Sequence, residues 1–262
     1  MFSKNEMRKK LSCALKNREL YAVFQPKVDV TNNQIYSLEA LIRWHYQGQD
    51  IPLSTFYTLL QSDLLGHQVF KFIIKESLDM HKKLLDEGLT CAMSINVSNP
   101  TLKLPHAAEE ILELLEKSHI DKAAVKLEIL ECVDIFSDEI IQDNLKRLKA
   151  SGIPLILDDF GSGEFFLKNI QLVDFDAIKI DREICLTAQS NNLIRDIISS
   201  VVVYGQQNSK VIIAEGIETE PQQALMRSQG VEVFQGYLFA RPMAQRQVLP
   251  WLNNFYQQAA GY

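Results

Sequence analysis

The sequence lacks any apolar run approaching the roughly 18 residues that a membrane-spanning helix needs. Its first residues, Met1–Leu20, are rich in Lys, Arg, Glu and Asn and contain no apolar core, so we expect no signal peptide in them. We therefore expect a cytoplasmic protein with no membrane span.

Cysteine and histidine are scarce and scattered. The four cysteines (Cys13, Cys91, Cys132 and Cys185) form no C-x-x-C pair, which indicates reduced thiols in the cytosol. The five histidines show neither H-x-x-x-H nor H-x-H spacing, and surface or structural roles are expected for them. Cys132 has no histidine nearby in the sequence, so packing explains it better than nucleophilic catalysis.

Positive charge is also short: 27 Lys and Arg stand against 33 Asp and Glu, a net charge of −6. This balance argues against a protein that binds duplex DNA through a basic surface, and leaves room for a small anionic ligand held by local cations. Gly161-Ser162-Gly163 matches neither a nucleophile elbow nor a P-loop. No Ser/His/Asp triad can be assembled.

What the chain does have is an alternation of strand-like and helix-like segments. The predicted strands are Tyr21–Val30, Gln34–Trp44, Cys91–Val97, Val125–Leu130, Pro154–Leu157, Ala177–Ile180, Val211–Ala214 and Val231–Phe234. The predicted helices are Val69–Glu87, Ala107–Lys117, Ser137–Ser151, Asn191–Gln207 and Pro221–Gln229. An N-terminal helix precedes them, with Met7, Leu11, Ala14 and Leu15 at helical spacing.

Eight strands in 262 residues favour an α/β fold of the (β/α)₈ TIM-like barrel type. Thr31-Asn32-Asn33 is a short polar turn typical of a hairpin, so one of the first two strands should run antiparallel to the others. An open doubly wound sheet is the alternative, but the Gly-rich turn that would normally follow its first strand is missing. We expect one domain over residues 1–262, with a lead-in helix over 1–19 and the barrel over 20–262.

Polar residues interrupt or end these apolar runs. They are Glu39, Asn96, Glu128, Glu131, Asp158, Asp159, Lys179, Glu215 and Gln235. In a barrel the C-terminal strand ends converge on one mouth, so these side chains should gather in one site. Singly, each has an ordinary explanation: a helix cap, a turn, or for Lys179 a surface charge on an edge strand.

Jointly, so many carboxylates repel one another unless something neutralises them, and Lys179 alone cannot. A divalent cation can. An all-oxygen set of Asp, Glu and Asn suits Mg²⁺ or Mn²⁺, and the absence of Cys and His argues against Zn²⁺.

With these residues in view, the chain resembles the EAL family of cyclic di-GMP phosphodiesterases. The signature tripeptide is Glu39-Ala40-Leu41, and the likeness runs from Gln25-Pro26 to Pro242. It includes Ser94-Ile95-Asn96-Val97-Ser98, Leu127-Glu128-Ile129 with Glu131, Asp158–Gly163, Lys179-Ile180-Asp181, Ala214–Thr219, Gln235-Gly236-Tyr237 and Arg241-Pro242. The resemblance implies a (β/α)₈ barrel with an antiparallel early strand.

The resemblance also implies hydrolysis of the bacterial second messenger cyclic di-GMP to linear pGpG by metal-activated water. It assigns Glu39, Asn96, Glu128 and Asp158 to a first metal, and Asp158, Asp159 and Glu215 to a second. Lys179 holds the attacking water, Gln235 lines that site, and Glu131 anchors the loop after Asp158-Asp159. The implied substrate contacts are Gln25, Leu41, Arg43, Asp181, Glu218 and Gln235, with Glu218 in a supporting place.

Two metals, Mg²⁺ or Mn²⁺, are implied as cofactors, with Ca²⁺ inhibiting because it favours looser coordination. The expected partners are cyclic di-GMP, pGpG and a second copy in a homodimer; the sequence indicates no protein partner and no DNA.

The chain departs from the family pattern in the loop beyond the paired aspartates. Glu164-Phe165-Phe166-Leu167 replaces the usual Tyr-Ser-Ser/Thr-Leu, Leu130 and Cys132 replace Thr and Ser, and Leu60-Gln61 replaces Ala-Glu. In the family, that loop couples the metal site to the dimer interface. These changes spare the implied metal ligands and Lys179, so we interpret them as tuning of the activity and not as its loss. Some family members have lost catalysis, so the alternative function is a catalytically weak or inactive domain that acts as a cyclic di-GMP receptor or protein-binding regulator. A metal-dependent barrel enzyme that acts on another substrate is the third hypothesis.

Overall fold

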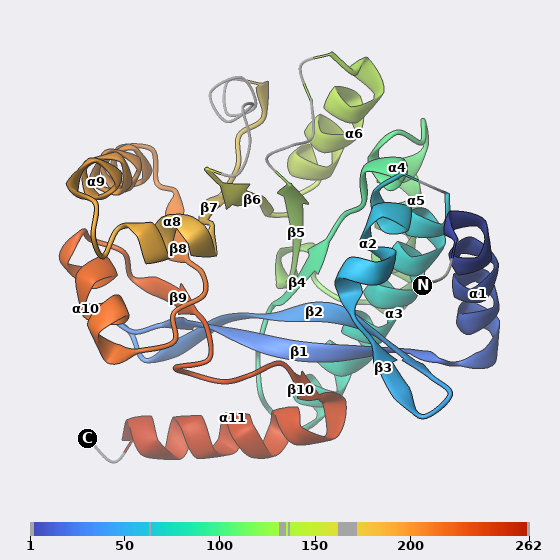
Figure 1. Ribbon diagram of the computed structural model, residues 1–262, viewed down its shortest axis with the longest axis horizontal. Coiled ribbons are helices and arrows are strands. Elements are labelled where there is room, and N and C mark those ends of the chain that lie inside the picture. Colours follow the sequence, from blue (N-terminus) through green and yellow to red (C-terminus); the bar gives the residue numbers. More distant parts are fainter. Residues whose placement is uncertain (1–2, 63, 131–134, 136, 162–171, 261–262) are drawn as a thin grey trace.

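The computed structural model of this chain describes residues 3–62, 64–130, 135, 137–161 and 172–260 (Figure 1). The strands are β1 Leu20–Asp29, β2 Gln34–Tyr46, β3 Gln49–Ile51, β4 Met93–Asn96, β5 Val125–Leu130, β6 Leu155–Phe160, β7 Ala177–Ile180, β8 Val211–Ala214, β9 Val233–Gln235 and β10 Met243–Ala244. The α-helices are α1 Lys4–Asn17, α2 Leu53–Ser62, α3 Leu65–Asp86, α4 Asn99–Leu102, α5 Ala107–Ser118, α6 Glu139–Ala150, α8 Arg182–Thr187, α9 Asn192–Gln207, α10 Glu220–Ser228 and α11 Gln245–Ala260. No described helix has the length and apolar character that crossing a membrane requires.

Eight strands close into the predicted barrel. From β2 the parallel pairs run through β4, β5, β6, β7, β8 and β9, and β1 closes the ring by pairing with both β9 and β2. Both pairings of β1 are antiparallel, so β1 is the reversed strand that the hairpin turn predicted. The predicted (β/α)₈ class is confirmed.

The β1–β2 turn forms for a local reason. The Asp29 side chain accepts hydrogen bonds from the backbone N–H groups of Thr31 and Asn32, which folds the chain back on itself. Asn33 takes the left-handed conformation, with φ of 51°, which asparagine tolerates better than most residues. These two hydrogen bonds and the left-handed Asn33 close the turn of the long β1–β2 hairpin.

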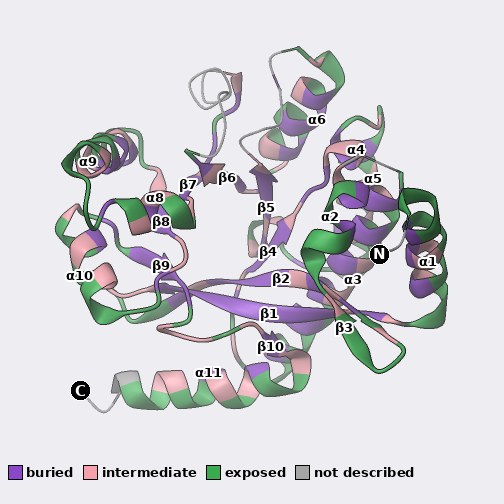
Figure 2. Cartoon of the chain, in the orientation of Figure 1, coloured by how far each residue is buried: buried purple, intermediate pink, exposed green. Residues whose placement is uncertain are grey.

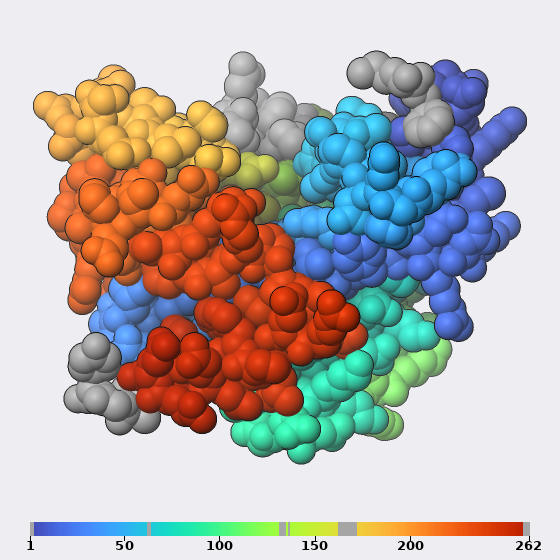
Figure 3. Space-filling model, turned by 60° about the horizontal axis from the view of Figure 1, so that its bottom comes forward, coloured from blue at the N-terminus to red at the C-terminus, as the bar shows by residue number. Residues whose placement is uncertain are grey.

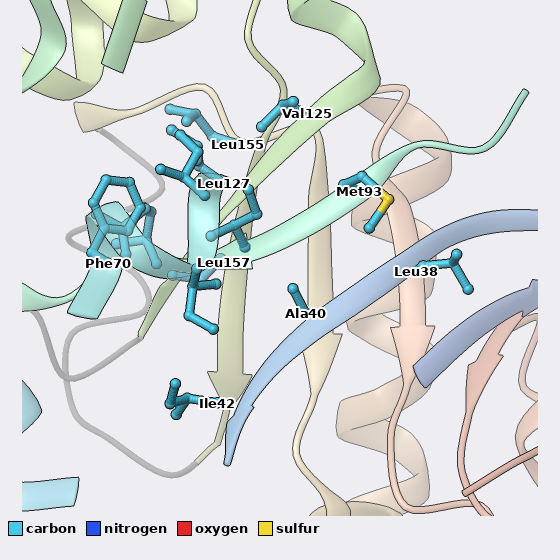
Figure 4. Packing of buried hydrophobic residues seen from close by; sticks show 14 of the residues in the cluster. Leu38, Ala40, Ile42, Phe70, Met93, Val125, Leu127, Leu155 and Leu157 are labelled. Carbon is cyan, nitrogen blue, oxygen red and sulfur yellow. The ribbon is translucent and has the colours of Figure 1, made fainter. Parts of the chain in front are cut away.

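Alternation along the strands separates two cores. Residues on the outer face of the barrel pack against the helices, and Figure 4 shows Leu127, Leu155 and Leu157 grouped beside Phe70 of α3. Figure 2 shows the barrel strands almost wholly buried. Inside the barrel lies a small apolar layer of Ile156, Ala177, Ile213 and Val233.

Helices flank the barrel at both ends of the chain. In α1, Ser3 and Glu6 form a capping box, and Met7, Leu11 and Ala14 are buried as their spacing predicted. Helix α11 was not predicted, because Pro250 lies within it and reads as a helix breaker. Its first residues lie beside the end of α3, and Figure 3 shows the red C-terminal segment across this face of the molecule.

Asn144 of α6 offers a test of how the helical layer is held. Its buried amide accepts from Ala108 N and donates to the carbonyls of Leu102 and Leu104, 2.8–3.1 Å away. Asn144→Ala would leave these groups unpaired, so we expect it to lower the free energy of unfolding by about 3 kcal/mol. Denaturant titration measures this change, with the exposed Asn253→Ala as the control; equal stability of the two variants would contradict the assignment.

Candidate active site

The apolar layer inside the barrel carries a polar layer directly above it. Asp158, Lys179, Glu215 and Gln235 each follow an inner-layer residue by two positions on or just beyond the same strand. Because side chains two residues apart on a strand share a face, the apolar pattern of each strand end directs its polar residue into the barrel. The predicted convergence of strand ends on one site is therefore observed.

The strand β6 places two consecutive carboxylates on the same side. Its pairing with β7 slips between Leu157 and Phe160, so Asp158 and Asp159 stand opposite the single residue Lys179. Asp159 has φ of 58°, a left-handed conformation that costs a non-glycine residue energy. This strained bulge lets both aspartates line one cavity, where a regular strand would turn one away.

Lys179 is the electrostatic centre of the site. Its side chain is 1% exposed, and its Nζ lies 2.6 Å from Glu128 Oε2, 2.6 Å from Glu215 Oε1, 2.8 Å from Asp158 Oδ1 and 3.5 Å from Glu39 Oε2. The interpretation of Lys179 as an exposed charge on an edge strand is excluded by this burial.

Glu39 is held by hydrogen bonds from both sides. Its Oε1 accepts from the Asn96 amide at 2.7 Å, and its Oε2 accepts from the Gln235 amide at 2.8 Å. Gln235 is followed by Gly236, where an added Cβ would lie 2.0 Å from the carbonyl oxygen of Ile217. Only glycine permits this close approach, which seats the end of β9 against the loop after Glu215.

Burial and charge perturb the acidic groups in opposite directions. Desolvation, with repulsion from neighbouring carboxylates, raises the pKa of Asp158 to about 7 despite the attraction of Lys179. Desolvation and the charge of Asp158 raise the pKa of Asp159 to about 7 as well, and desolvation raises the pKa of Glu215. For Glu39 the burial is outweighed by Lys179 and Lys27 and by its hydrogen bonds, so its pKa falls below the ordinary value.

The lysine responds to the same field. Desolvation alone would lower the pKa of Lys179, but the carboxylates of Asp158, Glu128, Glu215 and Glu39 outweigh it and raise that pKa well above its usual value. The carboxylates therefore favour the charged ammonium form of Lys179.

A cavity of about 330 Å³ opens onto this layer. Its polar lining contains Gln25, Glu39, Asn96, Asp158, Asp159, Lys179, Glu215 and Gln235, and Leu41 lines it too. Its apolar wall comes from α2 and α3, through residues that include Tyr57, Leu60, Val69, Phe70 and Ile73. Such a cavity, with polar groups at one side and an apolar wall at the other, suits a small ligand that has a polar part and an apolar part.

Sequence reasoning missed one member of the cluster, Lys27 of β1. Its side chain has no exposed surface, and its ammonium pairs with Glu128 Oε1 and lies 3.4 Å from Glu39 Oε2. The available signal was a lysine in the strand-like run Tyr21–Val30, two residues after Gln25, which puts both on one face.

Several predicted residues lie away from the described cavity lining. Arg43 donates to the carbonyl of Ile42, Asp181 caps α8 by accepting from Glu183 N, and Glu218 pairs with Arg182 at 2.9 Å. Their substrate contacts stay predictions. Glu131, Cys132 and the Glu164-Phe165-Phe166 departure lie outside the described residues.

The acidic cluster fits divalent cations. Asp158, Asp159 and Glu215 can place one carboxylate oxygen each within 4.8 Å of one another. Within the described residues, Glu39 and the fully buried Glu128, which lies off the cavity lining, bring the carboxylates to five, against the two ammonium groups of Lys27 and Lys179. The donors are all oxygen atoms, which hard divalent ions prefer.

Comparisons with known proteins agree with this geometry. The family model described as EAL domain matches residues 8–242. The cyclic di-GMP phosphodiesterase RocR of Pseudomonas aeruginosa is 31% identical over 91% of this chain and 61% of its own length. The cyclic di-GMP phosphodiesterase PdeR of Escherichia coli is 25% identical over 94% of this chain and 37% of its own length. The chain thus spans less than two thirds of these relatives.

Among solved structures, the MucR phosphodiesterase in complex with c-di-GMP superimposes with a TM-score of 0.85 at 27% identity. That match covers 92% of this chain and 99% of the MucR chain. The cGMP-bound form of the EAL enzyme Bd1971 gives a TM-score of 0.87 at 25% identity, covering 94% of this chain and 68% of the other. The chain therefore belongs to the EAL domain family.

Proposed function

We propose that this protein hydrolyses one phosphodiester bond of cyclic di-GMP, giving linear pGpG, in a reaction that depends on Mg²⁺ or Mn²⁺. The observation that supports this most is the convergence of four carboxylates on Lys179 within 3.5 Å, beside a cavity of about 330 Å³. Relatives that share this domain are named cyclic di-GMP phosphodiesterases, and the MucR phosphodiesterase holds c-di-GMP in its structure.

The residues of the chain divide the work. Glu39, Asn96, Glu128 and Asp158 would hold one cation, and Asp158, Asp159 and Glu215 a second. When bound, these ions would acidify a water molecule and offset the negative charge that builds on the phosphoryl oxygens. Lys179, already at the cavity, orients the attacking water and stabilises the hydroxide it becomes. Gln235 keeps Glu39 in place through its amide hydrogen bond.

The remaining proposals concern ligand and context. Gln25 and Leu41, which line the cavity, would contact the nucleotide, and Arg43 would meet a phosphate through its fork of donors. Ca²⁺ would occupy the site and inhibit. The protein would work in the cytoplasm as a homodimer.

The test is incubation of purified protein with cyclic di-GMP under four conditions: Mg²⁺, Mn²⁺, Ca²⁺ and EDTA. Chromatography then identifies the nucleotides, and a parallel binding measurement follows cyclic di-GMP retention. We expect pGpG to form in the presence of Mg²⁺ or of Mn²⁺, and no pGpG in the presence of Ca²⁺ or EDTA. Retention of cyclic di-GMP without product would make the chain a receptor. If both product and retention are absent, the domain acts on another substrate.

Metal binding should weaken as the pH falls below 7. Because the pKa values of Asp158 and Asp159 both lie at about 7, protons compete with the cation for these oxygens below that pH. From pH 8 to pH 6 the Kd for Mn²⁺ should rise about tenfold if the cation displaces a proton from one aspartate, and about a hundredfold if it displaces a proton from each of the two. Calorimetry in two buffers of different ionisation enthalpy measures both the Kd and the protons released. A Kd that stays constant across this range would rule the explanation out.

A further inference from the structure

Lys27 is a fully buried lysine in the reversed strand β1. Its register partners are Ser37 on β2 and Gln235 on β9, so it stands between the strands that carry Glu39 and Gln235. A buried ammonium is costly unless carboxylates pair with it. The proposed chemistry gives this residue no role, although it is as deeply placed as Lys179.

Glu128 lies between the two lysines. Its Oε1 pairs with Lys27 Nζ, and its Oε2 accepts from Lys179 Nζ at 2.6 Å. The three groups form a chain from the wall of the barrel to the cavity. Within the described residues, Lys179 lines the cavity, whereas Lys27 and Glu128 do not.

This placement gives the two lysines different freedom. Lys179 has four carboxylate partners and lines the cavity, so a group bound in the cavity can take the place of one partner. Lys27 has Glu128 and Glu39 as partners and no exposed surface, so a ligand cannot reach it. If Lys27 were absent, both oxygens of Glu128 would depend on Lys179.

We propose that Lys27 is a positioning residue, which fixes Glu128 from within the barrel and thereby leaves Lys179 free to face the attacking water. This inference rests on the proposed phosphodiesterase function. Without Lys27, the unpaired Glu128 oxygen draws Lys179 inward, away from the cavity. Cation binding should persist, because removing a positive charge does not weaken the attraction of the carboxylates for a cation.

The kinetic test is Lys27→Met in the full chain. We expect kcat to fall roughly ten- to hundredfold, as for other groups that orient a metal-site residue, with KM within about threefold. The Kd for Mn²⁺, measured by electron paramagnetic resonance, should stay the same or fall. The control is Lys126→Met, which removes a lysine of β5 that packs over the ring of Tyr36; its kcat should stay within about twofold of the parent.

The second readout is independent of turnover. In EDTA, Lys27→Met should lower Tm by roughly 10 °C, because the negative charge of buried Glu128 loses its Lys27 partner. Adding Glu128→Gln to Lys27→Met removes that charge and should recover at least half of the loss. A role in packing alone predicts no recovery, since the double variant restores no volume.

The outcomes separate the two claims. Wild-type kcat in Lys27→Met, or a double variant no more stable than the single one, overturns the role of Lys27. Absence of turnover in the parent protein overturns the proposed function, and the recovery in Tm then still decides whether Lys27 anchors Glu128. If Lys27→Met does not fold, a folded double variant supports the anchoring and an unfolded one contradicts it.

Discussion

Asp158→Ala is expected to abolish turnover of cyclic di-GMP, by roughly a thousandfold or more, while the fold survives. Asp158 contacts Lys179 and shares the cavity with Asp159 and Glu215, and under the proposed function it would be a ligand of both cations. Product formation with Mn²⁺ measures the loss, and circular dichroism checks the fold. The same loss is expected for Glu39→Ala. The exposed Asp79→Ala on α3 is the control, and near-normal activity in Asp158→Ala would defeat the metal assignment.

The same residue should show that function opposes stability. Its folded pKa of about 7 exceeds the ordinary value of 3.8, so between these pH values the folded protein binds more protons than the unfolded one. The stability that protonated Asp158 contributes is therefore fully present below about pH 3.8 and is lost as the pH rises through 7. At pH 8 in EDTA, Asp158→Asn should have a higher Tm than the parent, and the difference should shrink toward pH 5. A lower Tm at pH 8 would contradict this sign.

Lys179→Met is expected to lower kcat by roughly 10²- to 10³-fold while KM changes by less than about threefold. Lys179 contributes to a charge that develops during the reaction, whereas substrate binding uses the rest of the cavity. Steady-state kinetics separate the two constants, and Lys75→Met on α3 serves as an exposed control. An equal loss of kcat and of substrate affinity would contradict a water-orienting role.

Stability gives Lys179 a second signature. Four carboxylates share its ammonium, so in EDTA the variant leaves them without their common cation and should lose much of its Tm. Mn²⁺ should restore more Tm to Lys179→Met than to the parent, because the ion replaces the missing charge. A loss of Tm that Mn²⁺ does not reverse would indicate a packing defect instead.

The barrel could be predicted because each strand carries its own evidence. The runs Val125–Leu130, Ala177–Ile180 and Val211–Ala214 match the observed strands at both ends, and the turn at Thr31-Asn32-Asn33 indicated the reversed strand. Helix α11 was missed because it contains Pro250, and a proline in the sequence normally indicates the end of a helix.

The site could be predicted in composition but not in geometry. Polar residues at strand ends identified Glu39, Asn96, Asp158, Lys179 and Glu215 as neighbours. Local sequence does not reveal that Asp159 adopts φ of 58° and turns a second carboxylate inward. It also does not distinguish Lys27, since a lysine in a strand is more often exposed, and its burial depends on Glu128, 101 residues later.

The central claim is that the acidic cluster holds the cations on which turnover depends. The most direct measurement titrates Mn²⁺ into EDTA-treated protein with cyclic di-GMP, following bound Mn²⁺ by paramagnetic resonance and pGpG by chromatography in the same sample. We predict no pGpG before Mn²⁺ is added, product that rises with bound Mn²⁺, and loss of both in Asp158→Ala. Full turnover in EDTA, or Mn²⁺ binding unchanged in Asp158→Ala, would contradict the account.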